Sequence, residues 1–283
     1  NEIASNNKIY QLHIVPESTP DVEALLFRIK NIISISDRKM SMLKKQIKKR
    51  KSWDTTIISD NLTWSEFSRI NLFLHELQGA EPTVSIARFY SDNSSAHAIG
   101  YVSEISANDL KTKTYLQNLK IEGIGVGKTG LESSLDEQML GSPGYLRYEV
   151  NAYGKKIKQV ATNKGLKGKT FRTTLDQSIQ KFSAEVFKDV SGASCVMDIY
   201  NGDIVSMVSA PNFNPNSFVH GVNYNEWKEL IENRDKPLLN KAVSGLYPPG
   251  STIKTLTALS ALENDIVSSK LIVKCKGYID LHG

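Results

Sequence analysis

The dipeptide Asn201-Gly202 lies between two apolar runs, CVMDIY at 195–200 and DIVSMVSA at 203–210. Asn-Gly accepts the positive φ angles of a type I′ turn, and such turns join antiparallel strands. The pattern therefore predicts a β-hairpin, with Pro211 closing its second strand. This is the strongest local constraint that the chain carries.

An amphipathic helix is expected just before the hairpin. Its apolar positions recur at helical spacing: Leu175, Ile179, Phe182 and Val186. A helix followed by an antiparallel hairpin predicts an α+β domain. Upstream, residues 141–169 are rich in glycine and lysine and include a strand-like stretch at 145–153, which indicates a linker with one or two exposed strands. We place a domain boundary near residue 165, giving domains 1–165 and 166–283.

The first domain alternates strand-like and helix-like stretches. The elements expected there are a strand at 8–16, a helix at 21–35, a helix from the Thr63-x-x-Glu66 capping box to about Leu77, strands at 83–90 and 96–102, and a helix at about 108–119. His97 falls in the second of the two later strands and is interpreted as structural. In the second domain, residues 211–247 are expected to be rich in loops.

The charge is mildly basic, with a formal net charge of +5 over 283 residues. Eight basic side chains gather at 38–51: Arg38, Lys39, Lys44, Lys45, Lys48, Lys49, Arg50 and Lys51. This run could bind nucleic acid or a membrane surface. A solvated helix face is the favoured interpretation, because no aromatic side chains for base stacking interleave with the charges.

Two cysteines cannot define a disulfide framework. Cys195 lies in an apolar run and is expected to be buried, whereas Cys275 could be free, disulfide-bonded or a zinc ligand. No metal or cofactor site is predicted. No run of 18 apolar residues exists, and no signal peptide is present, so the chain reads as an excised piece of a longer protein.

A candidate nucleophile follows a turn of prolines and glycine at 248–250. Ser251 precedes an apolar helical pattern, with Ile253, Leu256, Leu259 and Leu262 at three-residue spacing, so Ser251 is expected at or near the helix N-cap. Lys254 would lie one turn on, within reach of the Ser251 hydroxyl, as a base beside a serine nucleophile. We expect the helix to be buried, because a lysine acts as a base only when neutral and desolvation favours that form.

The bare Ser-x-x-Lys pattern has little specificity. It also occurs at Ser5, Ser36, Ser41 and Ser178, and most serines at helix starts are ordinary caps. Residues 123–130, GIGVGKTG, partly match a dinucleotide fingerprint and a phosphate loop. The first lacks a hydrophobic strand leading into it, and the second has Glu122 where glycine is required.

The ordered segments TTLDQSIQ (173–180), GASCVMDIYNGDIVSMVSAPNFNPN (192–216) and KPLLNKAVSGLYPPGSTIK (236–254) resemble class B penicillin-binding proteins, and in particular members that act in cell elongation. GVGKTGLE (125–132), LGSPG (140–144), AHAIGYV (96–102) and YQLHIVPE (10–17) fit the same family upstream. The resemblance therefore covers nearly the whole chain.

This resemblance implies an elongated pedestal domain of the dimerisation type, followed by the first part of an α+β transpeptidase domain. Ser251 would be the acylated nucleophile and Lys254 the general base, although the base is disputed in some members of the group. The substrates would be peptidoglycan stem peptides ending in D-Ala-D-Ala, which β-lactams mimic. Expected partners are a RodA-type glycosyltransferase and elongation scaffold proteins, with no nucleic acid. The protein would lie at the periplasmic face of the bacterial inner membrane, held by an anchor that this chain lacks.

In this family the second and third active-site motifs follow the nucleophile. Here Ser59-Asp60-Asn61, Ser91-Asp92-Asn93 and Lys128-Thr129-Gly130 match those motifs but precede Ser251. We interpret the two serine motifs as polar turns and the third as a structural segment of the pedestal. Because the expected motifs are missing after Ser251, the chain alone is expected to be inactive. A non-catalytic docking module and a serine β-lactamase or β-lactam sensor remain as alternatives.

Overall fold

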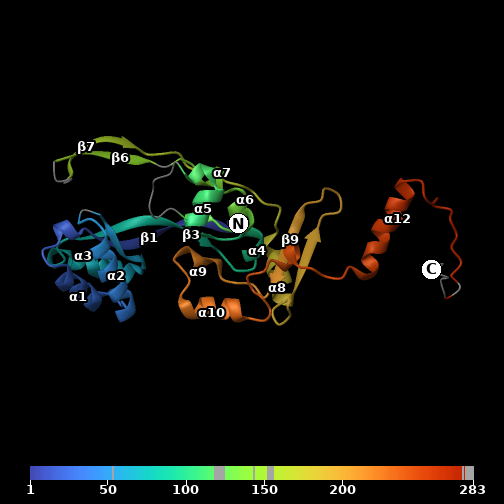
Figure 1. Ribbon diagram of the computed structural model, residues 1–283, viewed down its shortest axis with the longest axis horizontal. Coiled ribbons are helices and arrows are strands. Elements are labelled where there is room, and N and C mark those ends of the chain that lie inside the picture. The colour runs from blue at the N-terminus through green and yellow to red at the C-terminus, as the bar shows by residue number, and fades with distance from the viewer. Residues whose placement is uncertain (53, 118–124, 143, 152–155, 276, 278–283) are drawn as a thin grey trace. The chain divides into compact units, whose positions relative to one another are not determined.

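A computed structural model describes residues 1–52, 54–117, 125–142, 144–151, 156–275 and 277. The chain forms two compact units, Asn1–Val243 and Ser244–Gly283. Each unit is described by itself. Helices and strands are mixed in the first unit, which gives the predicted α+β class (Figure 1).

The first unit begins with a three-stranded antiparallel sheet. β1 (Ala4–Ile14) lies between β2 (Thr56–Leu62) and β3 (Ala80–Tyr90). β1 pairs with β3 along its whole length, from Ala4 opposite Tyr90 to Ile14 opposite Ala80, but with β2 only from Tyr10 onward. The strands predicted at 8–16 and 83–90 are thus confirmed.

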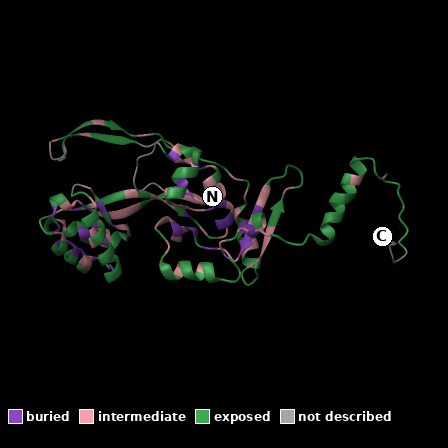
Figure 2. Cartoon of the chain, viewed as in Figure 1, coloured by how far each residue is buried: buried purple, intermediate pink, exposed green. Residues whose placement is uncertain are grey.

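Three helices pack on this sheet: α1 (Val22–Ile32), α2 (Asp37–Lys49) and α3 (Trp64–Leu72). Their first turns are capped by Asp21, Ser36 and the predicted Thr63–Glu66 capping box. Short 3-10 turns lie in two of the connections, Pro16–Ser18 between β1 and α1 and Leu74–Glu76 between α3 and β3. Buried residues, purple in Figure 2, occur on both the sheet and these helices and form one apolar cluster that includes Leu12, Ile14, Leu26, Ile29, Ile58 and Ile70.

The basic run at 38–51 mostly forms α2. The buried residues of this helix are Leu43 and Ile47, and the charged side chains around them are exposed or half-buried. The interpretation as a solvated helix face is confirmed.

Short elements follow in the centre of the unit. They are α4 (Ala96–Ile99), β4 (Val102–Glu104), α5 (Ala107–Thr112), a 3-10 turn (Thr114–Leu116), β5 (Gly125–Gly127), α6 (Gly130–Ser134) and α7 (Asp136–Leu140). β4 and β5 pair antiparallel. The helix predicted at 108–119 ends at Thr112, and the last two residues of that prediction lie outside the described residues.

The strand predicted at 96–102 is wrong over most of its length. Ala96, His97 and Ile99 are all buried, which a single helical turn achieves and a strand with alternating faces does not. Gly100 then adopts φ +85°, and an added Cβ would lie 1.8 Å from the Thr129 carbonyl oxygen, so only glycine fits. Extended structure starts at Val102.

A long hairpin connects the central elements to the next helix. β6 (Tyr145–Val150) and β7 (Lys156–Asn163) pair only with each other among the described residues, and their described side chains are largely exposed. This confirms the expectation of one or two exposed strands in the 141–169 region.

The hairpin predicted around Asn201-Gly202 is confirmed, but its turn is not type I′, because Asn201 lacks the positive φ that this type requires. β8 (Gly192–Met197) pairs with β9 (Ile204–Ala210), and Gly202 has φ +78° in the turn between them. Cys195 is exposed, contrary to the prediction. The sheet has only two strands among the described residues, and α8 (Gln177–Val186) packs on β9. Few residues therefore shield the side chains of β8 from solvent.

Helix α8 forms as predicted, but its buried side is different. Ile179, Phe182 and Val186 are exposed, whereas the side chain of Gln180 is completely buried. The apolar spacing located the helix correctly and assigned the wrong face to the core. Burial of an amide is possible here because hydrogen bonds satisfy it on both its oxygen and its nitrogen.

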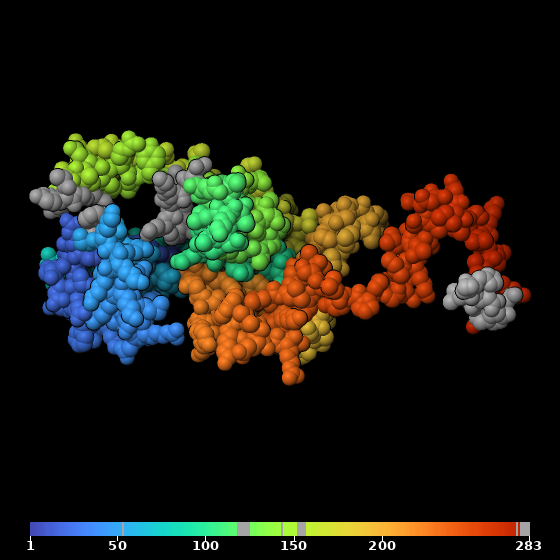
Figure 3. Space-filling model, viewed as in Figure 1, coloured from blue at the N-terminus to red at the C-terminus, as the bar shows by residue number. Residues whose placement is uncertain are grey.

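The loop-rich segment predicted at 211–247 contains three helices: α9 (Pro215–Val219), α10 (Tyr224–Glu232) and α11 (Lys241–Ser244). Asn214 and Asn223 cap the first two, and this signal was available in the sequence. Ala96, Phe213 and Phe218 form a second apolar cluster with Tyr101 packed against it. In Figure 3 the orange surface of α9 and α10 lies directly against the green residues of the central elements.

Candidate functional site

Ser251 lies in a 3-10 turn, Gly250–Thr252, that leads directly into α12 (Ile253–Glu263). Gly250 has φ +54°, and Pro249, Thr252 and Ile253 have helical backbone angles. The N-cap of α12 is Thr252, so Ser251 lies one residue before it, near the predicted position. The sequence Pro-Pro-Gly therefore sets the entry into the helix, as its turn residues suggest.

Lys254 lies in the first turn of α12. Because the 3-10 turn of Ser251 and Thr252 runs directly into α12, residues three apart lie close to one face, and Ser251 and Lys254 are such a pair. Neither side chain makes a hydrogen bond within the part of the chain that the structure describes. The structure thus brings the two residues to one face, but no hydrogen bond links their side chains.

The expected burial of α12 is wrong for this structure. The apolar residues of its periodic pattern are all partly or largely exposed, Leu256 to 63%, and Lys254 is exposed as well. The physical reason is that Ser244–Gly283 contains no second described helix or strand on which an apolar face could pack. Desolvation, which a lysine base requires, is not provided within this unit.

The start of α12 has no side-chain cap, although the Thr252 and Ile253 N–H groups bond the Pro249 and Ser251 carbonyl oxygens. No side chain caps it, because the Thr252 hydroxyl donates to the Pro249 carbonyl oxygen instead of accepting from the first turn. Unsatisfied N–H groups at a helix start carry a partial positive charge. An alkoxide or oxyanion at Ser251 would be favoured by that charge.

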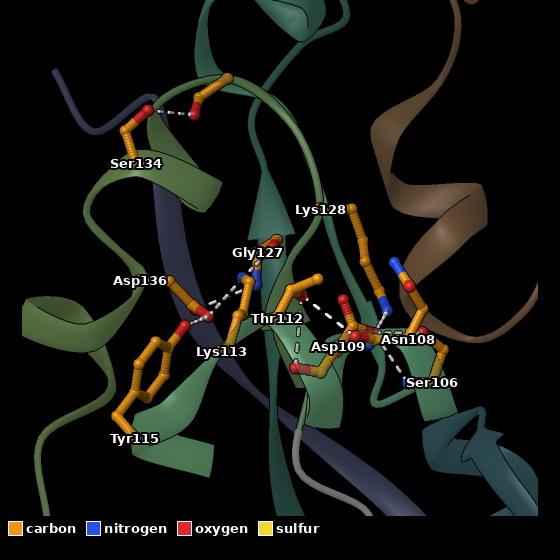
Figure 4. Close-up of polar contacts among 11 residues, drawn as sticks. Ser106, Asn108, Asp109, Thr112, Lys113, Tyr115, Gly127, Lys128, Ser134 and Asp136 are labelled. Atoms are coloured by element: carbon orange, nitrogen blue, oxygen red, sulfur yellow. Dashed lines mark hydrogen bonds and ion pairs between the residues drawn. The ribbon is translucent and has the colours of Figure 1, made fainter.

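The Lys128-Thr129-Gly130 segment has a structural role (Figure 4). The Lys128 ammonium hydrogen-bonds Asp109, and Asp109 also accepts from the Ser106 hydroxyl at 2.5 Å. Burial raises the pKa of Asp109, but the hydrogen bonds from Lys128 and Ser106 outweigh it and hold that pKa at about 2. Lys128 is therefore committed to a partly buried ion pair and is not available to a phosphate or a substrate.

The neighbouring glycine belongs to the same network. The Asp136 carboxylate accepts from the Gly127 N–H and from the Lys113 ammonium, both at 2.9 Å, and from the Tyr115 hydroxyl. A Cβ on Gly127 would meet the Glu132 carbonyl oxygen at 2.0 Å. The glycines of this segment thus permit close packing of β5 against α6, which explains the partial matches to nucleotide-binding patterns without a nucleotide.

The two Ser-Asp-Asn matches differ from each other. Ser91-Asp92-Asn93 lies in a turn after β3, as expected, where Asp92 accepts from Ser94 and Gln177. Ser59-Asp60-Asn61 lies within β2 and not in a turn, so that expectation is wrong. Strand pairing with β1 outweighs the turn preference of these polar residues.

His97 is buried against Phe213, with ring centroids 5.0 Å apart at a right angle. Burial and the nearby Lys241 charge lower its pKa to about 4, so the ring is neutral at neutral pH. This environment agrees with the interpretation of His97 as structural.

Gln180 is a buried polar residue whose role was not predicted from the sequence. Its amide nitrogen donates to the carbonyl oxygens of Ser94 and Met207, at 2.6 and 2.8 Å. Its amide oxygen accepts from the Ser206 hydroxyl and the Met207 N–H, at 3.1 and 2.9 Å. Its position beside the apolar residues of α8 gave no signal of burial, because the groups that bond it lie far away in the sequence.

Among the described residues, no three His, Cys, Asp or Glu side chains are grouped so that they could hold a metal ion. Cys275 is a free, exposed thiol. No helix within the described part of the chain is both long and apolar enough to cross a bilayer.

Two family models match the chain. The penicillin-binding protein dimerisation domain matches residues 1–173, and the penicillin-binding protein transpeptidase domain matches residues 192–281. Ser251 and Lys254 fall within the second match.

Curated relatives share this arrangement over nearly the full chain. The peptidoglycan D,D-transpeptidase MrdA of Acinetobacter baumannii is 29% identical over 282 residues, which cover 99% of this chain and 42% of the relative. The protein of the same name from Escherichia coli K12 is 28% identical over 285 residues, covering 99% and 45%. The chain thus spans less than half the length of these relatives.

The fold is also similar to solved structures. The complex between penicillin-binding protein PBP2 and MreC from Helicobacter pylori contains a chain with a TM-score of 0.76 and 25% identity, covering 99% of this chain and 52% of that one. PBP2 alone from the same organism gives a TM-score of 0.73. Because the dimerisation model covers more than half of its residues and the transpeptidase model follows in order, this chain belongs to the penicillin-binding proteins.

Proposed function

We propose that the protein is a peptidoglycan D,D-transpeptidase that cross-links the cell wall during elongation, with Ser251 as nucleophile and Lys254 as general base. The observation that carries this proposal is the position of Ser251 and Lys254 on one face at the uncapped start of α12, inside the transpeptidase match. The names of the MrdA relatives supply the reaction and the substrate class.

The reaction proceeds in two acyl transfers. The Ser251 hydroxyl oxygen attacks the carbonyl carbon of the penultimate D-alanine, its proton passes to the neutral Lys254 amine, and the terminal D-alanine leaves with that proton. An amine of a second stem peptide then attacks the ester, forms the cross-link and releases Ser251. Negative charge on the carbonyl oxygen develops beside the N–H groups that start α12. A β-lactam acylates Ser251 in the same way and leaves slowly.

This chemistry requires α12 to be covered. A lysine in water is an ammonium ion and cannot accept the serine proton, and Lys254 is exposed in Ser244–Gly283. We therefore propose that the 283-residue chain alone neither cross-links peptides nor retains penicillin. In the intact protein the helix would be covered, and the same two residues would react.

The proposed location is the periplasmic face of the inner membrane, where peptidoglycan substrates occur. The proposed partners are a RodA-type glycosyltransferase and elongation scaffold proteins. The scaffold is supported by the Helicobacter pylori PBP2 complex with MreC. That complex also supports a second candidate function, in which the protein acts as a non-catalytic docking module. The long dimerisation match before Ser251 argues against a β-lactamase or a sensor.

A fluorescent penicillin tests the nucleophile. In the intact protein, saturable labelling should be abolished by Ser251→Ala and retained by Ser260→Ala, which changes an exposed serine on the same helix. Labelling that survives Ser251→Ala would refute the assignment. Normal growth and wall shape with Ser251→Ala, despite lost labelling, would favour the docking module.

A further inference from the structure

The net positive charge of the chain is concentrated on one helix. Helix α2, Asp37–Lys49, carries six basic side chains and one acidic side chain, a net charge of +5. This equals the formal net charge of all 283 residues, so the other residues together are neutral. Such a concentration of charge on one helix creates a local field that attracts anions.

Four of these cations lie on the side of α2 that points away from the core. Leu43 and Ile47 are the buried residues of the helix and mark its inner side. With about 3.6 residues per turn, the opposite side carries exposed residues only. We call this set the outer face of α2, and it consists of Arg38, Ser41, Met42, Lys45, Lys48 and Lys49. Within the described residues, its basic side chains make no hydrogen bond and no ion pair.

Carboxylates on or beside α2 contact side chains outside the outer face. The contacts are Asp37 with Lys30, Glu23 with Lys44 at 3.3 Å, and Asp60 with the His220 ring at 3.5 Å. The outer face therefore keeps its positive charge.

An exposed aromatic ring lies beside α2. Glu23, Phe27 and Lys30 share one stripe of α1, at spacings of four and three residues. Ion pairs join the two ends of this stripe to α2, Glu23 to Lys44 and Lys30 to Asp37. The two helices therefore lie antiparallel beside each other (Figure 1), with Phe27 between the two ion pairs. Phe27 is nevertheless 66% exposed.

We propose that the outer face of α2, together with Phe27, docks on an anionic phospholipid surface. Basic side chains gathered on one helix attract anionic head groups. Phe27 and Met42, exposed to 66% and 63%, can enter the boundary between head groups and acyl chains. A soluble polyanion would use the cations but leave both apolar side chains in water, so a bilayer fits the face better. The site does not depend on the acyl-transfer reaction at Ser251.

Co-sedimentation with lipid vesicles tests the proposal. The 283-residue chain should bind vesicles that contain phosphatidylglycerol, bind vesicles of phosphatidylcholine alone far more weakly, and be released as the salt concentration rises. The triple variant Lys45→Gln/Lys48→Gln/Lys49→Gln should weaken binding about 10²-fold, because each cation near an anionic bilayer contributes about a factor of five. Its control, Lys167→Gln/Lys169→Gln/Arg172→Gln, removes three exposed cations elsewhere and should leave binding unchanged.

A second variant tests the apolar contact. Phe27→Ala should weaken vesicle binding about threefold or more, because the ring loses its place at the acyl-chain boundary. Phe182→Ala, which removes another exposed phenylalanine, should not. Thermal unfolding shows whether each variant folds.

Three outcomes would overturn the proposal. Equal loss of binding in the two triple variants would reduce the effect to net charge. Vesicle binding unchanged by Phe27→Ala would remove the contact that distinguishes a bilayer from other anions. A DNA duplex or an acidic peptide that binds more tightly than the vesicles would make a soluble polyanion the ligand instead.

Discussion

The two units of the chain differ in what holds their residues in place. In Asn1–Val243, apolar side chains of α1, α2 and β1 are buried together, and buried polar groups such as Asp136 and Gln180 are hydrogen-bonded. In Ser244–Gly283, α12 has no buried residue at all, yet this unit carries the two residues assigned to chemistry, Ser251 just before α12 and Lys254 in its first turn.

This difference separates stability from reactivity. Substitutions in the first unit should change the free energy of unfolding and leave acylation in the intact protein little altered while the fold persists. Substitutions at Ser251 and Lys254 should do the reverse. Four experiments test this separation, in decreasing order of expected effect.

Lys254→Ala should lower the rate of penicillin acylation in the intact protein by about 10²–10⁴-fold, the usual contribution of a positioned base. Its melting temperature should stay close to that of the unchanged protein, because Lys254 makes no described hydrogen bond. Stopped-flow acylation and thermal unfolding measure the two quantities. Lys270→Ala, which removes another exposed lysine of the same unit, serves as the control. An acylation rate unchanged by Lys254→Ala would reject the base.

Leu12→Ala should destabilise the 283-residue chain by about 2–5 kcal/mol, because it leaves a cavity at a completely buried position in the main core. Urea unfolding measures the change. Leu72→Ala, at an exposed position on α3, should cost far less. If the two variants were equally stable, the core described between the sheet and its helices would be wrong.

Lowering the pH should weaken the first unit through His97. Its folded pKa is about 4 and its unfolded pKa 6.5, so the unfolded state binds the proton first as pH falls. The contribution of neutral His97 to the free energy of unfolding is therefore complete above about pH 6.5. It falls by up to about 3 kcal/mol as the pH is lowered to about 4. Urea unfolding between pH 7.5 and 4.5 should show this slope reduced in His97→Asn and kept in His75→Asn, whose ring is exposed. If His97→Asn left the dependence of the unfolding free energy on pH unchanged, another group would take up the proton and the assignment to His97 would be wrong.

Leu256→Ala should change the stability of the 283-residue chain by less than about 0.5 kcal/mol, since the side chain is 63% exposed. The result is informative because the same substitution at the buried Leu12 should cost much more stability. A loss of 2 kcal/mol or more would show that α12 packs its apolar face within this chain.

The sequence predicted those elements whose signals are local. The Asn201-Gly202 hairpin and the Thr63–Glu66 capping box depend on a few neighbouring residues, and both are confirmed. The strand predicted at 96–102 failed because Ala96, His97 and Ile99 are all buried, and the partners that bury them, such as Phe213, are distant in sequence. The burial of Cys195 and of α12 failed because apolar patterns show which face can be covered and not what covers it.

For the candidate site too, local signals predicted some features and not others. The helical placement of Ser251 and Lys254 follows from Pro-Pro-Gly and the apolar period, whereas their roles come from resemblance and stay predictions. The domain boundary near residue 165 also stays a prediction. Gln180 could not be predicted as a buried residue, because its four partners lie on segments 26 to 86 positions away.

The Gln180 amide has a consequence for exchanging parts between relatives. Because one side chain bonds both the Ser94 carbonyl and the Met207 backbone, α8, β9 and the turn before α4 form a matched set. A chimera that takes α8 from a protein with a non-amide residue at this position would leave buried donors and acceptors unpaired on two other segments. Splice points for such chimeras therefore belong outside this set, before Ser94 and after Ala210.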